Sequence, residues 1–177
     1  EKDLKVIIDE AERLNVLVND ILDLSKLQAN TERVNIIEYN LVEEIKAILN
    51  RYDIIKESEN YNFILELPDE AIVKADKNKI NQVIYNLINN AINYTGKDKK
   101  VLIRVTNKSK SYLVEIIDTG KGIKNDELPY IWDKYYKNEK NHQRSVVGSG
   151  IGLSIVRNIL EQHKFKYGVC SKKGKGS

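Results

Sequence analysis

The most periodic apolar pattern in the chain lies over residues 77–94, where apolar side chains recur at steps of three and four. This period predicts a helix, and Asp76 stands at the position of its N-cap. A helix with one apolar face must bury that face against a second layer. The apolar positions are Ile80, Val83, Ile84, Leu87, Ile88 and Ala91.

The segments around this helix alternate between strand-like and helical patterns. Short apolar runs predict strands at 34–39, 63–67, 71–75, 101–106, 112–117 and 167–170, the second and third flanking a turn at Pro68-Asp69. Helical spacing predicts helices at 41–57 and 151–162 and a short helical piece near 125–131. Helices mixed with mostly hairpin-linked strands favour an α+β fold, here a two-layer sandwich.

The first 29 residues predict one long amphipathic helix. Its apolar stripe, from Leu4 to Leu27, must pack on other helices in a bundle or coiled coil. An ordinary core helix of a single globule is the alternative. Because residues 30–35 are polar and the pattern then changes, we expect one unit over residues 1–30 and a second over residues 31–177.

The composition excludes several classes of protein. The 177 residues are 41% hydrophobic and 31% charged, enough to bury a core, and a net charge of +3 does not favour nucleic-acid binding. The single cysteine, Cys170, excludes an internal disulfide or a multi-cysteine zinc site. No run approaches the ~18 apolar residues of a membrane span, and no signal peptide opens the chain. The absence of methionine, even at position 1, favours a fragment of a longer protein.

Three carboxamides form a strip on the helix predicted over residues 77–94. Asn86, Asn90 and Asn93 lie beside its buried face, although Asn is a poor residue for a helix interior. An amide oxygen can bind Mg²⁺ without adding negative charge beside phosphates. The alternative is that asparagine is simply common in this chain.

Two glycine-rich motifs follow the asparagine strip. Residues 118–123 (Asp-Thr-Gly-Lys-Gly-Ile) come directly after an apolar strand, and a carboxylate there can accept a hydrogen bond from an exocyclic amine. Residues 148–153 (Gly-Ser-Gly-Ile-Gly-Leu) open a helix whose free N–H groups can bind an anion. Alone, the first could be a plain turn and the second a hinge. In this order, the three features form one coherent nucleotide site.

The ordered motifs resemble those of bacterial sensor histidine kinases of two-component systems, within the gyrase, chaperone and histidine-kinase ATPase superfamily. Residues 81–95 resemble the asparagine box of that family, residues 118–123 its first glycine box, residues 131–137 its aromatic box and residues 148–153 its second glycine box. Residues 11–27 are similar to the second helix of the dimerisation and phosphotransfer hairpin. The resemblance covers essentially the whole chain and implies a Bergerat-type ATP-binding domain behind that helix.

The resemblance implies a role for each matching residue. Asp118 would hold the adenine amino group, with Gly122 beneath the base and Tyr94 against its face. Asn90 would hold Mg²⁺, with Asn86 nearby as a second ligand or a phosphate contact. A lid over residues 134–149 would bring cationic side chains and glycine N–H groups to the phosphates. The implied ATP-binding residues are Asn86, Asn90, Asn93, Tyr94, Asp118, Gly120, Gly122, Ile123, Lys137, Arg144, Gly148, Gly150, Ile151, Gly152 and Leu153.

The chain departs from the family pattern at several positions. Asn93 replaces the usual lysine, Lys137 replaces arginine, and Lys164-Phe165 replaces a Gly-Gly pair. The phosphoacceptor histidine is missing, because neither His142 nor His163 is followed by an acidic residue or lies on a first hairpin helix.

The resemblance implies an ATP- and Mg²⁺-dependent protein-histidine kinase whose acceptor histidine lies outside this chain. Its partners would be a second copy, through the N-terminal helix, and a response regulator. This part of the parent would be cytoplasmic, whether or not the parent has a membrane anchor. The alternatives are a superfamily ATPase that couples hydrolysis to conformational change, and a degenerate, non-catalytic dimerisation module.

Overall fold

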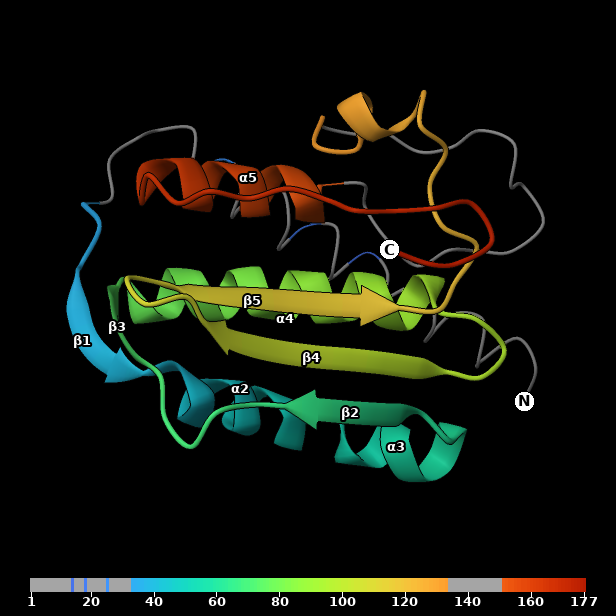
Figure 1. Cartoon of the computed structure of the whole chain (residues 1–177), viewed down its shortest axis with the longest axis horizontal. Helices are drawn as coiled ribbons and strands as arrows, with labels where there is room; N and C mark the ends of the chain where they lie inside the picture. The colour runs from blue at the N-terminus through green and yellow to red at the C-terminus, as the bar shows by residue number, and fades with distance from the viewer. Residues whose placement is uncertain (1–13, 15–17, 19–24, 26–32, 134–150) are drawn as a thin grey trace.

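The computed structural model describes residues 33–133 and 151–177, together with residues 14, 18 and 25 (Figure 1). Those three isolated residues are helical, as predicted, whereas the rest of the N-terminal helix lies outside the described residues. The predicted lid also lies outside them. None of the described helices is long and apolar enough to cross a membrane.

The strands form two small sheets. The larger has the order β2-β4-β5, built from β2 (Asn62–Glu66), β4 (Lys100–Asn107) and β5 (Tyr112–Asp118). β2 pairs with β4 in parallel, and β4 pairs with β5 as the predicted antiparallel hairpin. The second sheet pairs β1 (Ile37–Asn40) with β3 (Ile72–Ala75) in antiparallel orientation.

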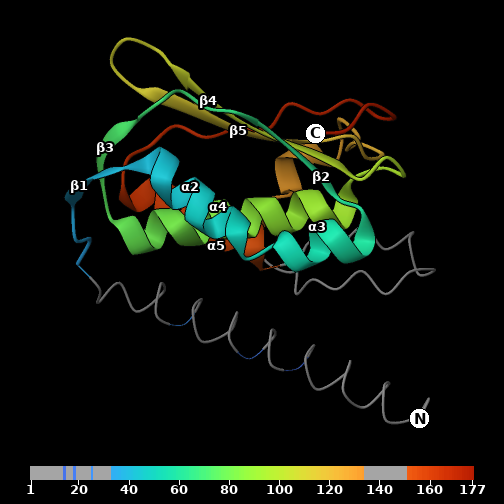
Figure 2. The same ribbon diagram turned by 90° about the horizontal axis from the view of Figure 1, so that it is seen from below.

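Helices form a second layer, which covers one face of the larger sheet (Figure 2). They are α2 (Leu41–Asn50), α3 (Asp53–Glu59), α4 (Lys77–Tyr94) and α5 (Gly152–Gln162), with a 3₁₀ turn, η1 (Leu128–Tyr130). The bounds of α4 are those predicted. Together the layers confirm the predicted two-layer α+β sandwich.

The core lies between the layers. Alternate residues of β4 face the helices, so Val101, Ile103 and Val105 are buried, and the predicted apolar stripe of α4 supplies Ile84 and Ile88 from the other side. α2 and α5 complete the same hydrophobic cluster. Burial of this stripe fixes the rotation of α4 about its axis.

One prediction about the segment before α4 is wrong. The helix predicted over residues 41–57 is interrupted at Tyr52, whose ring is buried and whose hydroxyl donates to Asn89 on α4 (2.8 Å). The strands predicted on either side of Pro68-Asp69 are present as β2 and β3, but they belong to different sheets, because β2 joins the larger sheet and β3 pairs with β1. Both outcomes follow from contacts distant in sequence.

The strand predicted over residues 167–170 is also wrong. These residues have no strand assignment, although they run beside β5 (Figures 1 and 2). The Tyr167 ring packs edge-on against Trp132 (4.9 Å between ring centroids), and its hydroxyl donates to Glu161 (2.8 Å). The backbone then bends into a turn closed by the isolated bridge between Lys172 and Gly176.

A buried polar junction joins three segments at the start of α4. Asp76 Oδ1 accepts from the Lys79 N–H (3.2 Å), as expected of an N-cap, and Oδ2 accepts from the Asn35 N–H (2.9 Å). The Asp76 N–H donates to His163 Nε2 (3.1 Å), just beyond α5. Asp76 therefore ties the segment before β1 to both long helices.

We expect Asp76→Ala to destabilise the domain by about 1–3 kcal/mol, because it leaves two backbone N–H groups without their acceptor. The measurement is the free energy of unfolding in urea. Asp69→Ala, at an exposed turn carboxylate, is the matched control and should change stability by less than about 0.5 kcal/mol. Equal unfolding midpoints for the two variants would contradict this role of Asp76.

Candidate functional site

The candidate site lies where the end of α4, the loop after β5 and the start of α5 meet. Asp118 is the last residue of β5, and its side chain is only 9% exposed. Its backbone N–H donates to the Ser177 carbonyl (2.9 Å), and its Oδ1 accepts from the Gly120 N–H (2.7 Å). The backbone on both sides of Asp118 therefore holds this carboxylate in place.

The Asp118 carboxylate is buried at an energetic cost. Burial raises the pKa of Asp118 above its ordinary value of 3.8, and the hydrogen bond from the Gly120 N–H partly opposes that shift. A buried carboxylate with an unfavourable desolvation energy is a recurrent property of functional sites. A ligand amine that donates to it would offset this desolvation.

The loop over residues 118–123 is wedged between two backbone segments. A Cβ at Gly120 would collide with the carbonyl of Tyr94 at the end of α4. Gly122 has a φ of +65°, and a Cβ there would collide with the Lys172 carbonyl. Only glycine at these two positions lets the loop lie this close to both neighbours.

Hydrogen bonds of two threonine hydroxyls attach the turn after α4 to its neighbours. The Thr119 hydroxyl donates to Asp98 Oδ1 in the turn between α4 and β4, and this bond lowers the pKa of Asp98. The Thr95 hydroxyl, which follows α4, donates to the Lys100 carbonyl (2.6 Å). The turn after α4 is therefore attached to both β4 and the Asp118 loop.

The three predicted carboxamides differ in exposure. Asn86 and Asn90 are half-buried, whereas Asn93 and the neighbouring Tyr94 are exposed. Among the described residues, Asn86 Nδ2 is buried and has no hydrogen-bond partner. Such a group is costly unless something else supplies an acceptor. This amide is therefore available for a ligand.

The start of α5 lies against the Asn86 amide. A Cβ at Gly152 would be 3.8 Å from both Cγ and Oδ1 of Asn86. Ile151 is fully buried, Ser154 donates to its carbonyl (2.7 Å), and Leu153 is half-buried. Within the described part of the chain, no side chain caps the first turn of α5. Its N-terminus thus points its dipole toward the Asn86 side of the site.

His163 does not meet the requirements of a phosphoacceptor. Its Nε2 accepts the Asp76 N–H, so Nδ1 carries the proton and donates to the Ile159 carbonyl (2.7 Å). Both ring nitrogens are engaged at the end of α5 opposite to Gly152. This arrangement agrees with the sequence expectation that His163 is not the acceptor.

Several predicted site residues lie outside the described residues. Lys137, Arg144, Gly148 and Gly150 all fall within residues 134–150, as does His142. Their roles stay predictions.

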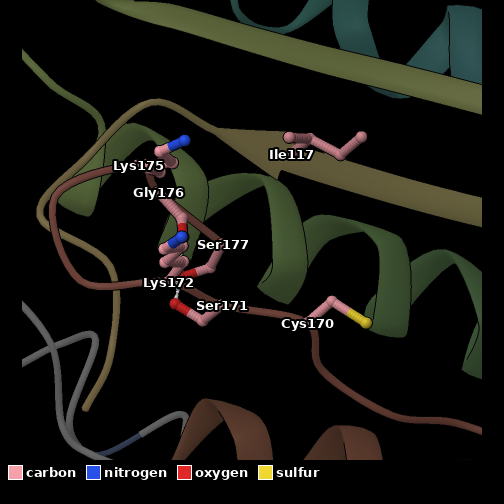
Figure 3. Close-up of a pocket in the computed structure, with 7 residues that line it drawn as sticks. All are labelled: Ile117, Cys170, Ser171, Lys172, Lys175, Gly176 and Ser177. Carbon is pink, nitrogen blue, oxygen red and sulfur yellow. Dashed lines mark hydrogen bonds between the residues drawn. The ribbon is translucent and has the colours of Figure 1, made fainter.

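The turn at residues 171–177 was not among the predicted parts of the site. The Ser171 hydroxyl accepts from the Ile123 N–H (2.7 Å), and the Gly174 N–H donates to the Lys121 carbonyl (2.6 Å). A pocket beside Ile117 of β5 is lined by this turn and by Cys170 (Figure 3). In the sequence, this turn is indicated by the pair Gly174 and Gly176, both of which have a positive φ.

Comparison with known proteins identifies the domain. The family model for the "Histidine kinase-, DNA gyrase B-, and HSP90-like ATPase" matches residues 75–177. The chain belongs to this ATPase family. The whole chain is also 32% identical, over 179 aligned residues, to the sensor protein kinase WalK of Staphylococcus saprophyticus. That match covers 98% of this chain but only 29% of WalK.

Solved structures resemble this ATPase domain closely. Full-length ShkA in complex with AMPPNP gives a TM-score of 0.82 at 18% identity, over 99% of this chain and 36% of ShkA, which supports the fold alone. The histidine kinase ThkA in complex with the response regulator TrrA gives a TM-score of 0.65 at 27% identity. That match covers 77% of this chain and 40% of ThkA. The resemblance to sensor histidine kinases is therefore confirmed at the level of the ATPase domain.

Asp118→Asn should stabilise the ATPase domain increasingly as pH rises from about 4 toward neutrality. The folded state binds the Asp118 proton more tightly than the unfolded chain does. Folding stability from this group is therefore lost as pH rises through its raised pKa, and asparagine does not titrate. Urea unfolding of both proteins over this range measures the difference. Exposed Asp69→Asn is the control, and a difference that stays flat or shrinks with pH would contradict the burial cost.

Proposed function

We propose that this chain is the ATP-binding half of a protein-histidine kinase. It would bind ATP with Mg²⁺ and present the γ-phosphate to a histidine outside residues 1–177. The observation that carries the proposal is the convergence of the buried Asp118 carboxylate, the Asn86 amide, whose Nδ2 has no partner among the described residues, and the positive end of the α5 dipole. The carboxylate suits the amine of the base, and the amide and the helix start suit the phosphates.

Asp118 would recognise the base. Its carboxylate, fixed by the Gly120 N–H, can accept from the exocyclic amine of adenine. Gly122 and Ile123 would lie beneath the base, as the resemblance to sensor histidine kinases implies. The exposed ring of Tyr94, 58% accessible, would cover one face of the base.

Asn90 would hold the metal beside the phosphates, and Asn86 would either add a second ligand through its amide oxygen or donate its buried N–H to a phosphate. Mg²⁺ usually takes one or two protein oxygens and completes its octahedron with water and phosphate oxygens. Two neutral amides fit that demand, and the described residues contain no cluster of three or more acidic, histidine or cysteine side chains that would bind a metal without a nucleotide. When bound, Mg²⁺ would neutralise charge on the transferring phosphoryl group.

The start of α5 would receive the phosphates. Backbone N–H groups from Ile151 to Leu153 lie at the positive end of the helix dipole. Gly148 and Gly150, together with Lys137 and Arg144, would close over the phosphates from the lid. Asn93 is exposed on the last turn of α4 and would contact the phosphates from there.

The rest of the proposal concerns the intact protein. Residues 1–30 would be the second helix of a dimerising hairpin, and residues 31–177 the catalytic domain. The curated relative is more than three times as long as this chain, and the related ThkA was solved with a response regulator. We therefore propose homodimerisation through the N-terminal helix and transfer of the phosphoryl group to a regulator aspartate. This part of the protein would act in the cytoplasm.

Asp118→Asn should weaken ATP binding by about 1.5–3 kcal/mol, because a charged acceptor becomes an amide that can present a donor to the adenine amine. Asn90→Ala should abolish the dependence of nucleotide affinity on Mg²⁺. Calorimetry with ATP and with ATP·Mg²⁺ measures both effects. Asn78→Ala, an exposed carboxamide at the start of α4, is the control and should bind as wild type. If both site variants bind as wild type, the site assignment is wrong.

Labelled ATP should leave residues 1–177 unlabelled, because His163 has both ring nitrogens engaged and lies at the far end of α5. Adding the upstream helix should restore labelling on a histidine outside this sequence. Acid-labile label on His142 or His163 would overturn the proposal. Steady ATP hydrolysis without labelling would favour a superfamily ATPase, and failure to bind ATP·Mg²⁺ would favour a non-catalytic module.

A further inference from the structure

The side chain of Ser171 joins the two backbone segments that border the proposed adenine site. We infer that Ser171 is a positioning residue. It fixes the separation between Asp118 and the Ile123 backbone, and thereby sets the preference for adenine over guanine. The role assumes the nucleotide site proposed above. Ser171 itself is half-buried and comes from the turn that sequence reasoning did not assign.

The Ser171 hydroxyl uses its full hydrogen-bonding capacity. It accepts from the Ile123 N–H (2.7 Å) and donates to the Gly176 carbonyl (3.0 Å). The Ser177 hydroxyl lies 2.8 Å from it and supplies the remaining proton. One proton and two lone pairs are the whole inventory of a serine hydroxyl. A group this fully engaged fixes the distance between its partners.

The same turn holds the other end of the loop. The Ser177 carbonyl accepts from the Asp118 N–H (2.9 Å), and the Gly174 N–H donates to the Lys121 carbonyl (2.6 Å). Gly176 approaches the Asp118 carbonyl so closely that a Cβ would collide with it. The turn therefore touches the loop at its beginning, middle and end, and Ser171 makes the bond at the end.

The separation between Asp118 and Ile123 matters because, in the proposed site, Asp118 hydrogen-bonds to the edge of the base while the backbone of Gly122 and Ile123 lies beneath it. Adenine offers an amine to the carboxylate, whereas guanine places a carbonyl oxygen at the same position of the ring. Two acceptors facing each other are repulsive only while the base cannot slide away. A loop held at both ends keeps the base in that register, and a loop released at Ile123 lets guanine shift.

The test uses four forms of the 177-residue chain: wild type, Ser171→Ala, Ser171→Thr and Lys173→Ala. Alanine removes the hydroxyl, threonine keeps it, and Lys173 is an exposed residue of the same turn. Calorimetry gives the affinities for ADP and GDP, and hydrogen exchange of the Ile123 amide reports the tether without nucleotide. Urea unfolding of each form separately measures any loss of overall stability. Ser171→Cys keeps the volume and weakens the bonds, and it replaces the alanine variant should that variant not fold.

We expect Ser171→Ala to reduce the ADP-to-GDP affinity ratio by on the order of tenfold, the equivalent of one lost hydrogen bond. The Ile123 amide should exchange faster in the same variant, while the threonine and Lys173→Ala forms keep wild-type values. An unchanged ratio in Ser171→Ala would overturn the inference even if stability falls, as would a threonine variant that behaves like alanine. If wild type binds neither nucleotide, both the proposed function and the specificity role fail.

Discussion

Burial of one face of α4 against β4 determines where the candidate site can be. Ile84 and Ile88 are almost completely buried, and this burial fixes the rotation of the helix. Asn86 and Asn90, which follow those residues by two positions, must then lie to one side of the core rather than in it. The carboxamides are half-buried for this reason, and the start of α5 completes the space beside them.

The buried polar groups beside α4 include both satisfied and unsatisfied ones. At its start, both carboxylate oxygens of Asp76 have backbone donors, and both ring nitrogens of His163 have partners. Toward its other end, Asn86 Nδ2 has no partner among the described residues, and Asp118 is buried with a raised pKa. Satisfied polar groups specify a structure, whereas unsatisfied ones cost stability and mark where a ligand fits. Asp76 and His163 therefore fix the start of α4, whereas Asn86 and Asp118 would gain hydrogen bonds from a bound ligand.

Much of the fold was accessible from local sequence patterns. The bounds of α4, the cap at Asp76 and the β4–β5 hairpin depend on residues close in sequence, and all were predicted. The break at Tyr52, the parallel pairing of β2 with β4 and the unpaired segment at residues 167–170 depend on distant partners, which periodicity does not reveal.

The motifs of the candidate site could be found in the sequence, but the contacts that hold the Asp118 loop in place could not. Asp118 and Gly120 were found because the Asp-x-Gly-x-Gly pattern has a chemical reason. The contacts of Ser171 with Ile123 and Gly176 are bonds of one hydroxyl with backbone groups, and a lone serine carries no such signal in sequence. The residues of the lid stay predictions, since they lie outside the described residues.

The long separations of these contacts imply an order of assembly. The β4–β5 hairpin and α4 close short loops and can form early, whereas the Ile123–Ser171 bond spans 48 residues and the Asp76–His163 bond spans 87. During synthesis on the ribosome, α4 and the Asp118 loop emerge well before the turn that borders that loop. The Asp118 loop thus acquires its final shape only after residues 171–177 have left the exit tunnel and docked.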